Sequence, residues 1–349
     1  MTEVLEPAAL DAPSDLGDVA IVARLGAYLT QELRTSVRVE GFRRFTGGLS
    51  WITAAFALHT GRGDALDARD FIVKIGSPAG LMAPYSSRPQ SVVLRALAGT
   101  AVPVPVMRWD SDDARILGAP FLITDRVEGI ELNPFTRDYG IADAGVLAPV
   151  GEHLAQVLGD LQRVDWRARG LSTLQGEDPR APAGREQVRF WRERVRQWSP
   201  KPYPLMDYAA AWLVRRTPMQ ARTVIVHGDY RVGNFLADGG RIRAMLDWEM
   251  THLGDPHEDL AWAMLPDMRL RGLLEHSAFI ARYEAASGLT VDPDALAYYR
   301  VFSLYKMVAI NLGGQSSFLA GGQDLRLVCL SNNIPMFMSR LAQALEGGV

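Results

Sequence analysis

The stretch that is most informative about the fold covers residues 224–259 and reads VIVHGDYRVGNFLADGGRIRAMLDWEMTHLGDPHED. It begins with an apolar run at residues 223–226 that is typical of a buried strand. His227 follows directly, and Asp229 comes two residues later beside a glycine, where a turn is expected. The segment therefore predicts a strand that delivers a histidine and a carboxylate to a polar loop.

The same pattern is repeated once along the segment. Asn234 lies five residues after Asp229, and a second apolar run at residues 242–246 leads to Asp247. Because two strands that end in neighbouring loops can bring their terminal residues together, we expect Asp229, Asn234 and Asp247 to lie close to one another.

These three residue types are the ones that phosphoryl transfer from ATP requires. One carboxylate positions and deprotonates a hydroxyl group, and an amide together with a second carboxylate holds magnesium. Magnesium is a hard cation that prefers oxygen ligands, which Asn and Asp side chains supply. The pattern of Asp229, Asn234 and Asp247 therefore predicts a kinase.

The motif H-G-D-x-x-x-x-N, followed by a strand ending in D-W-E, resembles the aminoglycoside phosphotransferase superfamily of small-molecule kinases, which are relatives of protein kinases. The strings LDWE at 246–249, LGDP at 253–256 and DLA at 259–261 are most similar to the kinase-like domains fused to some acyl-CoA dehydrogenases. The resemblance covers roughly residues 40–310 and is most specific between His227 and Asp259.

The resemblance implies a role for each residue of the motif. Asp229 would be the catalytic base, Asn234 and Asp247 would bind Mg²⁺, and His227 would brace the loop. It also implies ATP as the phosphoryl donor, with GTP left open as an alternative.

Each of these residues has a plainer interpretation. Asp or Asn beside Gly is usually turn chemistry, and His227 fits a hydrogen-bonded structural histidine better than an acid–base catalyst. A zinc site built from His227, His252 and His257 is an alternative, but the chain has no short Cys or His pair of the structural zinc type. Asp255 and Asp259 are expected to brace loops or to begin a helix.

The composition fits a cytoplasmic enzyme. The chain has 349 residues, 48% of them apolar and 22% charged, with a net charge of -3. This length allows a large core and about two domains or lobes. The single cysteine, Cys329, excludes an intramolecular disulfide. The sequence shows neither a signal peptide nor an apolar stretch of membrane-spanning length, and it lacks the basic cluster that nucleic acid would require.

The chain is expected to have an α+β, bilobal, protein-kinase-like fold. We expect residues 1–16 to form a disordered tail, residues 17–127 a β-rich N-lobe that binds nucleotide, and residues 128–349 a mostly helical C-lobe that holds the catalytic and acceptor sites. In the N-lobe the periodicity predicts helices at 18–33 and 91–98. It predicts strands at 37–45, 51–58, 71–75, 104–109 and 120–126. Beyond Val127, helices are expected, interrupted by the two strands around the catalytic loop.

The N-lobe offers candidate nucleotide-binding residues. Gly47 and Gly48 lie in the turn TGGLS at 46–50, where backbone amides and Ser50 could meet ATP phosphates, although an ordinary Gly-Gly turn explains that string equally well. Lys74 alternates out of phase with the apolar residues of its strand, so it is either a solvated edge lysine or a phosphate ligand.

The resemblance further implies that adenine lies against Asp125, Arg126 and Val127, mainly through their backbone groups. One departure matters here, because such kinases usually pair the strand lysine with a Glu on the next helix, and the matching position is Gln90. The hypothesis of an active enzyme therefore stands beside that of a weak or silent, nucleotide-binding kinase-like protein with a regulatory role.

The acceptor is expected to be a small molecule with a hydroxyl group. Residues 251–349 carry ten acids against seven Lys and Arg, an excess too small to attract a polycationic aminoglycoside. The sequence favours a partly apolar acceptor, such as a hydroxyacyl thioester, with residues 311–317 and 321–322 as a flexible rim. It indicates no obligatory protein partner.

Overall fold

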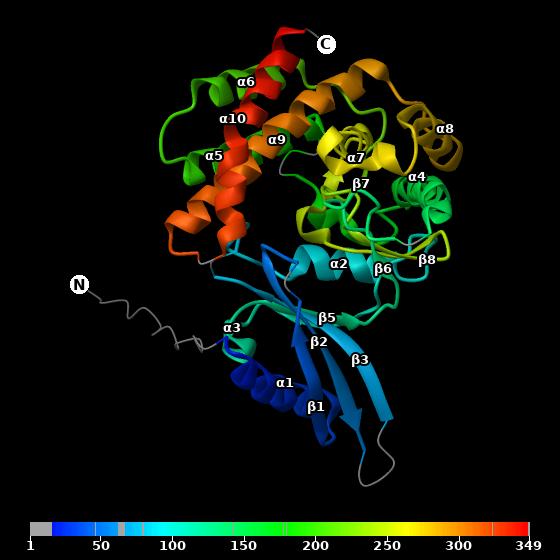
Figure 1. Ribbon diagram of the computed structural model, residues 1–349, viewed down its shortest axis with the longest axis vertical. Coiled ribbons are helices and arrows are strands. Elements are labelled where there is room, and N and C mark those ends of the chain that lie inside the picture. Colours follow the sequence, from blue (N-terminus) through cyan, green and yellow to red (C-terminus); the bar gives the residue numbers. More distant parts are fainter. Residues whose placement is uncertain are drawn as a thin grey trace, which may run out of the picture. The chain divides into compact units, whose positions relative to one another are not determined.

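The computed structural model describes residues 16–45, 47–61, 67–78, 80–141, 143–176, 178, 180–322 and 324–347 (Figure 1). The chain divides into two compact units. The first consists of the residues up to Arg88 together with Met107–Arg126, and the second consists of Pro89–Val106 together with Val127–Val349. The tail predicted at residues 1–16, apart from Leu16, lies outside the described residues, as does Thr46 of the predicted turn.

The first unit is a five-stranded antiparallel sheet with the order β1-β2-β3-β5-β4. Its elements have the following bounds: α1 Asp18–Leu33, β1 Val37–Arg44, β2 Trp51–Thr60, β3 Asp67–Gly76, β4 Met107–Ser111, α3 Ala114–Leu117 and β5 Phe121–Asp125. The apolar face of α1 (Ile21, Leu25, Leu29) packs in one core cluster with alternate residues of β2, β3 and β5. Because side chains alternate along a strand, Lys74, between the buried Val73 and Ile75, points to the sheet face opposite α1.

The predicted helix and strands of this unit are all present, although β3 begins at Asp67 and not at residue 71, and the short helix α3 was not predicted. The fourth strand was expected at 104–109 and instead begins at Met107. Pro103 and Pro105 explain the difference, because proline has no N–H to donate to a sheet.

The second unit is mostly helical. Its helices are α2 Arg88–Leu97, α4 Leu147–Arg163, α5 Ala183–Trp198, α6 Pro204–Arg216, α7 His257–Ala263, α8 His276–Ser287, α9 Pro293–Leu319 and α10 Leu325–Glu346, with 3₁₀ turns at Ala144–Val146, Leu171–Leu174, Trp248–Met250, Pro266–Met268 and Leu270–Gly272. Its strands are β6 Ile130–Glu131, β7 Val224–Val226, β8 Phe235–Asp238, β9 Arg241–Met245 and β10 His252–Gly254.

These strands form two small sheets. β7 pairs with β10, and β8 lies between β6 and β9. The prediction contained β7 and β9 and missed the other three. β7 is also short, but all of its residues are apolar, whereas β6, β8 and β10 have two to four residues that include a charged residue, a histidine or a glycine, and they show no clear strand pattern. A β-rich first unit and a helical second unit confirm the predicted α+β class. Among the described residues, no helix has the length and apolarity needed to cross a membrane.

The prediction of a flexible rim at residues 311–317 is wrong. The segment lies inside α9, which continues to Leu319. A Cβ on Gly313 would lie 2.9 Å from the Trp198 ring, and one on Gly314 would lie 2.7 Å from Leu330. The two glycines therefore permit close helix packing and do not act as hinges, and the turn after α9 lies at Ala320 and Gly321.

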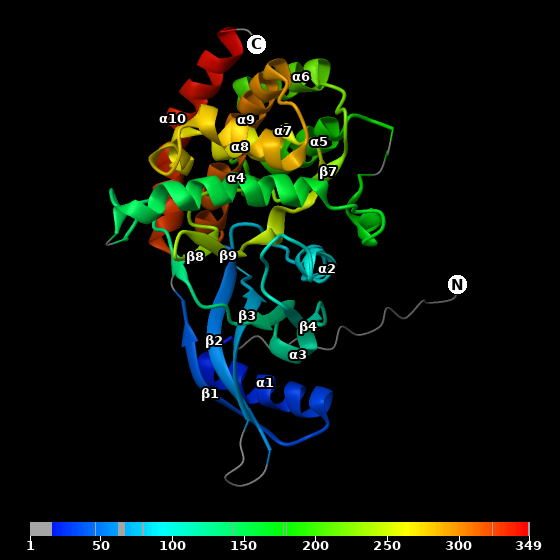
Figure 2. The ribbon, with the colours of Figure 1, turned by 90° about the vertical axis from the view of Figure 1, so that its right-hand side faces the viewer.

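A glycine in α4 allows a similar approach. Figure 2 shows α4 and α8 side by side in the second unit, and a Cβ on Gly159 would lie 2.5 Å from the Cβ of Ala286 and 2.8 Å from the backbone nitrogen of Ser287. We expect Gly159→Ala to lower the free energy of unfolding by about 1–3 kcal/mol through overpacking.

The matched control is Gly26→Ala in α1, where a Cβ would meet nothing within 4 Å. This substitution should stabilise the protein by about 0.5–1 kcal/mol, because alanine is the better helix former. Denaturant unfolding measures both changes, and a neutral or stabilising Gly159→Ala would contradict the close helix contact.

Candidate active site

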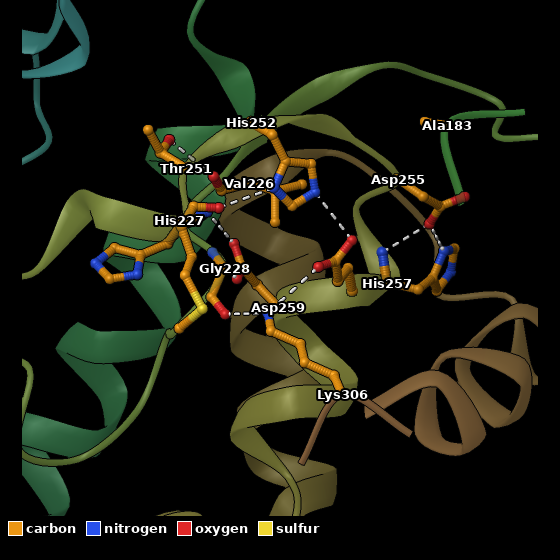
Figure 3. A network of polar contacts seen from close by, with 12 residues as sticks. Ala183, Val226, His227, Gly228, Thr251, His252, Asp255, His257, Asp259 and Lys306 are labelled. Atoms are coloured by element: carbon orange, nitrogen blue, oxygen red, sulfur yellow. Dashed lines mark hydrogen bonds and ion pairs between the residues drawn. The ribbon is translucent and has the colours of Figure 1, made fainter. Parts of the chain in front are cut away.

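The loop that follows β7 is held by a buried carboxylate on α7. The backbone N–H of His227 donates to Asp259 Oδ2 at 2.7 Å, and that of Gly228 donates to Asp259 Oδ1 at 2.9 Å. Asp259 is fully buried, and burial raises its pKa to about 6 against the opposing effect of the two N–H donors. The expectation that Asp259 braces a loop is confirmed, and Figure 3 shows its carboxylate beside the two residues.

His227 links this loop to the end of β9. Its Nδ1 accepts a hydrogen bond from the N–H of Asp229 at 3.2 Å, so its Nε2 carries the proton and donates to the carbonyl of Leu246 at 2.8 Å. Burial lowers the pKa of His227 to about 4. The imidazole is therefore neutral near pH 7 and acts here as a hydrogen-bonded spacer between two chain segments.

Gly228 has a backbone conformation that favours glycine, with φ +84°, and a Cβ there would lie 2.4 Å from the carbonyl oxygen of Met250. Its own carbonyl accepts a hydrogen bond from the ammonium group of Lys306, on α9. The residue before Asp229 is thus fixed through both of its backbone polar groups.

The Asp229 carboxylate accepts hydrogen bonds from three side chains. Trp262 Nε1 donates to Oδ1 at 2.8 Å, Asn234 Nδ2 to Oδ2 at 2.6 Å, and Arg231 Nε lies 3.1 Å from both oxygens. The Asp229 side chain is 13% exposed, so the carboxylate is oriented by the protein and still reaches the surface. A carboxylate held in this way can accept a proton from a group that approaches its open side.

The structure brings Asn234 and Asp247 to the same place. The N–H of Leu246 donates to the carbonyl of Asn234 at 2.8 Å, and Asp247 follows at the end of β9 with φ +65°. Because the Asn234 amide nitrogen faces Asp229, its oxygen is the end that remains for a cation. The amide oxygen of Asn234 and the carboxylate of Asp247, on segments joined by this backbone hydrogen bond, are of the hard-oxygen type that Mg²⁺ prefers.

A buried charge network lies behind the loop, and its lysine was missed from the sequence. Lys306 Nζ lies 3.6 Å from Glu258 Oε1, and His252 Nε2 lies 3.1 Å from Glu258 Oε2. Burial alone would raise the pKa of Glu258, but His252 and Lys306 outweigh it and lower that pKa. Burial likewise acts to lower the pKa of His252, and Glu258 raises it above its usual value. The sequence signal that could have identified Lys306 is its position as the one charged residue in the mostly apolar segment 301–312.

The zinc alternative is wrong. His227 contacts the carbonyl of Leu246, His252 contacts Glu258, and His257 Nδ1 lies 2.7 Å from Asp255 Oδ1. Across the described part of the chain, no group of three or more His, Cys, Asp or Glu side chains could hold a metal.

The sequence-predicted nucleotide-binding residues lie mainly in the first unit. Lys74 is half-buried on β3, opposite Thr53 of β2, and Ser50 is buried just before β2. Gly47 and Gly48 connect β1 to β2, and a Cβ on Gly48 would lie 3.2 Å from the carbonyl oxygen of Trp51.

The segment 125–127 leaves the sheet at the end of β5. Asp125 forms an ion pair with Arg108 at 2.6 Å, and the N–H of Arg126 donates to the carbonyl of Asp70 at 3.1 Å. That N–H is committed to the sheet, so an adenine would have to use other backbone groups up to Val127. In the second unit, Gln90 of α2 is buried, and its Nε2 has no hydrogen-bond partner in the described structure.

Comparison with known proteins places this site in context. A family model described as the phosphotransferase enzyme family matches residues 42–299. The chain is 26% identical over 293 residues to acyl-CoA dehydrogenase family member 10 of Mus musculus, covering 76% of this chain and 26% of that protein. It is 27% identical over 250 residues to acyl-CoA dehydrogenase family member 11 of Gallus gallus, covering 66% and 31%. The chain thus spans about a quarter to a third of the length of these curated relatives.

A kinase also matches. Hygromycin-B 4-O-kinase of Escherichia coli is 25% identical over 206 residues, which is 55% of each protein.

Two solved structures show the fold. One is a protein of Ralstonia eutropha whose name assigns it provisionally to the aminoglycoside phosphotransferases. Its TM-score to this chain is 0.67, its sequence identity is 22%, and the match covers 93% of this chain and 98% of that one. The other is an aminoglycoside phosphotransferase APH(4)-Ia mutant in a ternary complex with AMP-PNP and hygromycin B, with a TM-score of 0.59, 18% identity and coverage of 92% and 98%. These likenesses confirm the predicted bilobal, protein-kinase-like fold.

The loop geometry makes a prediction about Gly228. Gly228→Ala should destabilise the protein more than Gly239→Ala, although both residues have positive φ, because a Cβ at Gly239 (φ +53°) would meet nothing within 4 Å. We expect about 1 kcal/mol for Gly239→Ala from backbone strain alone. The clash with Met250 should add about 1–3 kcal/mol for Gly228→Ala. Equal losses in denaturant unfolding would show that the loop is not held against Met250.

Proposed function

The chain belongs to the phosphotransferase enzyme family, and on that premise we propose that it transfers the γ-phosphate of ATP, with Mg²⁺, to a hydroxyl group of a small molecule. The observation that carries the proposal is the oriented, partly exposed carboxylate of Asp229 beside the amide of Asn234. Asp247 lies at the end of the neighbouring strand. These are the groups that such a transfer requires.

In the proposed reaction Asp229 is the catalytic base. The acceptor hydroxyl gives its proton to the Asp229 carboxylate while its oxygen forms a bond to the γ-phosphorus. The bond from the γ-phosphorus to the oxygen that bridges it to the β-phosphorus breaks, and ADP leaves with that oxygen. The hydrogen bonds from Trp262, Asn234 and Arg231 orient the carboxylate for this contact.

Asn234 and Asp247 are the residues proposed to hold Mg²⁺, through the amide oxygen and the carboxylate. When bound, the cation would neutralise charge on the phosphates of the nucleotide. His227 keeps the two segments at a fixed separation, through its contacts with the loop and with Leu246.

For the nucleotide we propose Lys74 as a phosphate ligand, with Gly47, Gly48 and Ser50 near the phosphates and the segment 125–127 near the base. The likeness to an APH(4)-Ia structure in complex with AMP-PNP supports ATP as the donor. GTP is the alternative donor.

The acceptor is proposed to be a small hydroxylated molecule that is partly apolar. Relatives named as acyl-CoA dehydrogenase family members support an acyl-type acceptor, and the match to hygromycin-B 4-O-kinase supports transfer to a hydroxyl group. We propose that this occurs in the cytoplasm and without nucleic acid, membrane or an obligatory protein partner.

A second function is favoured by one specific observation. Gln90 occupies the position at which kinases of this type usually carry a Glu, and its buried Nε2 has no partner within the described residues. A neutral amide cannot pair with a lysine as a carboxylate does. This favours, as the alternative, a weak or silent kinase-like protein that binds nucleotide in a regulatory role.

Asp229→Asn separates these functions. The substitution keeps the shape of the side chain but removes the proton acceptor, so phosphate transfer should fall by roughly 10²-fold or more while nucleotide still binds. Transfer from radiolabelled ATP to a panel of hydroxylated acceptors, with nucleotide affinity measured in parallel, checks this. Asp238→Asn, at an exposed position at the end of β8, is the control and should leave transfer unchanged. Near-normal transfer by Asp229→Asn would remove this residue from the mechanism.

Asp247→Ala tests the metal site. Because the substitution deletes an anionic oxygen ligand, added Mg²⁺ should no longer tighten ATP binding, while affinity for ATP in the presence of a chelator should stay the same. Titration calorimetry with and without Mg²⁺ measures both. A magnesium effect equal to that of the unmodified protein would contradict the assignment of Asp247.

A further inference from the structure

Lys306 is 1% exposed and lies in the middle of α9. A buried charge is costly unless it is paired and hydrogen-bonded, so a lysine here needs strong partners. Lys306 has two polar ones: the carboxylate of Glu258 at 3.6 Å and the carbonyl of Gly228, to which it donates a hydrogen bond. The second partner lies next to Asp229. Figure 3 shows Lys306 reaching the loop from α9.

Lys306 also lies against two indole rings. Its Nζ is 4.7 Å from the ring centroid of Trp262 and 5.5 Å from that of Trp191, distances at which a cation is attracted to an aromatic face. The two rings differ in what their N–H groups do. Trp262 Nε1 donates to Asp229 Oδ1 at 2.8 Å, whereas Trp191 Nε1 has no hydrogen-bond partner among the residues that the structure describes.

We propose that Lys306 and Trp262 are positioning residues for Asp229, an inference that rests on the proposed phosphotransfer. Lys306 fixes the backbone before Asp229 through the Gly228 carbonyl, and it fixes the Trp262 ring through its charge. Trp262 then orients the carboxylate through its N–H. The cation on its ring face draws electron density from the indole and strengthens that N–H as a donor.

Trp262 differs from the other hydrogen-bond donors to Asp229 in its surroundings, because its side chain is packed in the core. Arg231 is 30% exposed, and the Asn234 amide belongs to the proposed metal site. Trp262 is 3% exposed, comes from α7 and packs on Lys306, so its position is set by the core of the second unit. Through Trp262, the helices α7 and α9 therefore determine the orientation of the Asp229 carboxylate.

The test compares Trp262→Phe with Trp191→Phe. Both variants keep an aromatic ring against Lys306, and each loses one indole N–H, but only the first N–H has an acceptor. Trp262→Phe should lower kcat by about tenfold, the loss expected for one hydrogen bond to a charged group, with KM for ATP and nucleotide affinity within about twofold. Trp191→Phe should leave kcat within about twofold. Equal effects of the two variants would overturn the proposal.

A double variant tests Lys306 without leaving an unpaired charge. Lys306→Met alone would leave Glu258 buried with His252 as its remaining ion-pair partner among the described residues and could unfold the protein. It is therefore combined with Glu258→Gln, which removes both charges, and His252, whose pKa Glu258 raises, can then stay neutral by losing its proton. The double variant should show the kcat loss of Trp262→Phe with nucleotide affinity retained. A double variant that folds and keeps full kcat would overturn the role of Lys306.

Amide hydrogen exchange gives a readout that does not depend on activity. The amides of residues 227–229 should exchange about tenfold faster in Trp262→Phe and in the double variant, and at an unchanged rate in Trp191→Phe. No transfer by the unmodified protein to any acceptor would overturn the phosphotransfer proposal, and the exchange comparison would still decide whether these residues position the loop. Identical exchange in all variants would contradict the inference.

Discussion

The two hydrogen bonds from the backbone of His227 and Gly228 to the carboxylate of Asp259 are the constraint on which the site depends. A loop leaving a strand has N–H groups that must find partners once they are buried. Because one rigid carboxylate receives two consecutive N–H groups, the direction of the chain is fixed just before Asp229. The neutral imidazole of His227 then satisfies the third N–H in the series, that of Asp229 itself.

This constraint explains why so much charge is buried behind the loop. Asp259 and Glu258 are neighbours on α7, and both are buried, so an uncompensated pair of carboxylates would repel strongly. Lys306 and His252 supply the balancing positive charge from α9 and β10. The pKa of Glu258 is lowered and that of His252 is raised, as expected for a buried ion pair that is close enough to outweigh desolvation. The helices of the second unit therefore support the site electrostatically as well as by packing.

Glycines allow neighbouring segments to pack closely in two different ways. At Gly228 the positive φ and the nearby Met250 carbonyl leave no room for a side chain, and the glycine lets the loop lie close to the 3₁₀ turn that ends at Met250. At Gly313 and Gly314 the conformation is ordinary helix, and what matters is the close approach of Trp198 and Leu330. A pair of adjacent glycines in a sequence does not distinguish these cases, because the difference lies in the neighbours.

The sequence alone determined the α+β class, the strands and the first helix of the first unit, and the three polar residues on the loops that follow β7 and β9, because these rest on local periodicity and on motif spacing. It did not determine β6, β8 and β10, the helical course of residues 311–317, or Lys306 as a partner of the loop. Those depend on contacts between residues far apart in the chain. Lys306 and Gly228 are 78 positions apart, and only the tertiary structure decides that a lysine in an apolar helix meets a carbonyl and a carboxylate there, since burial of its charge is tolerable only with both.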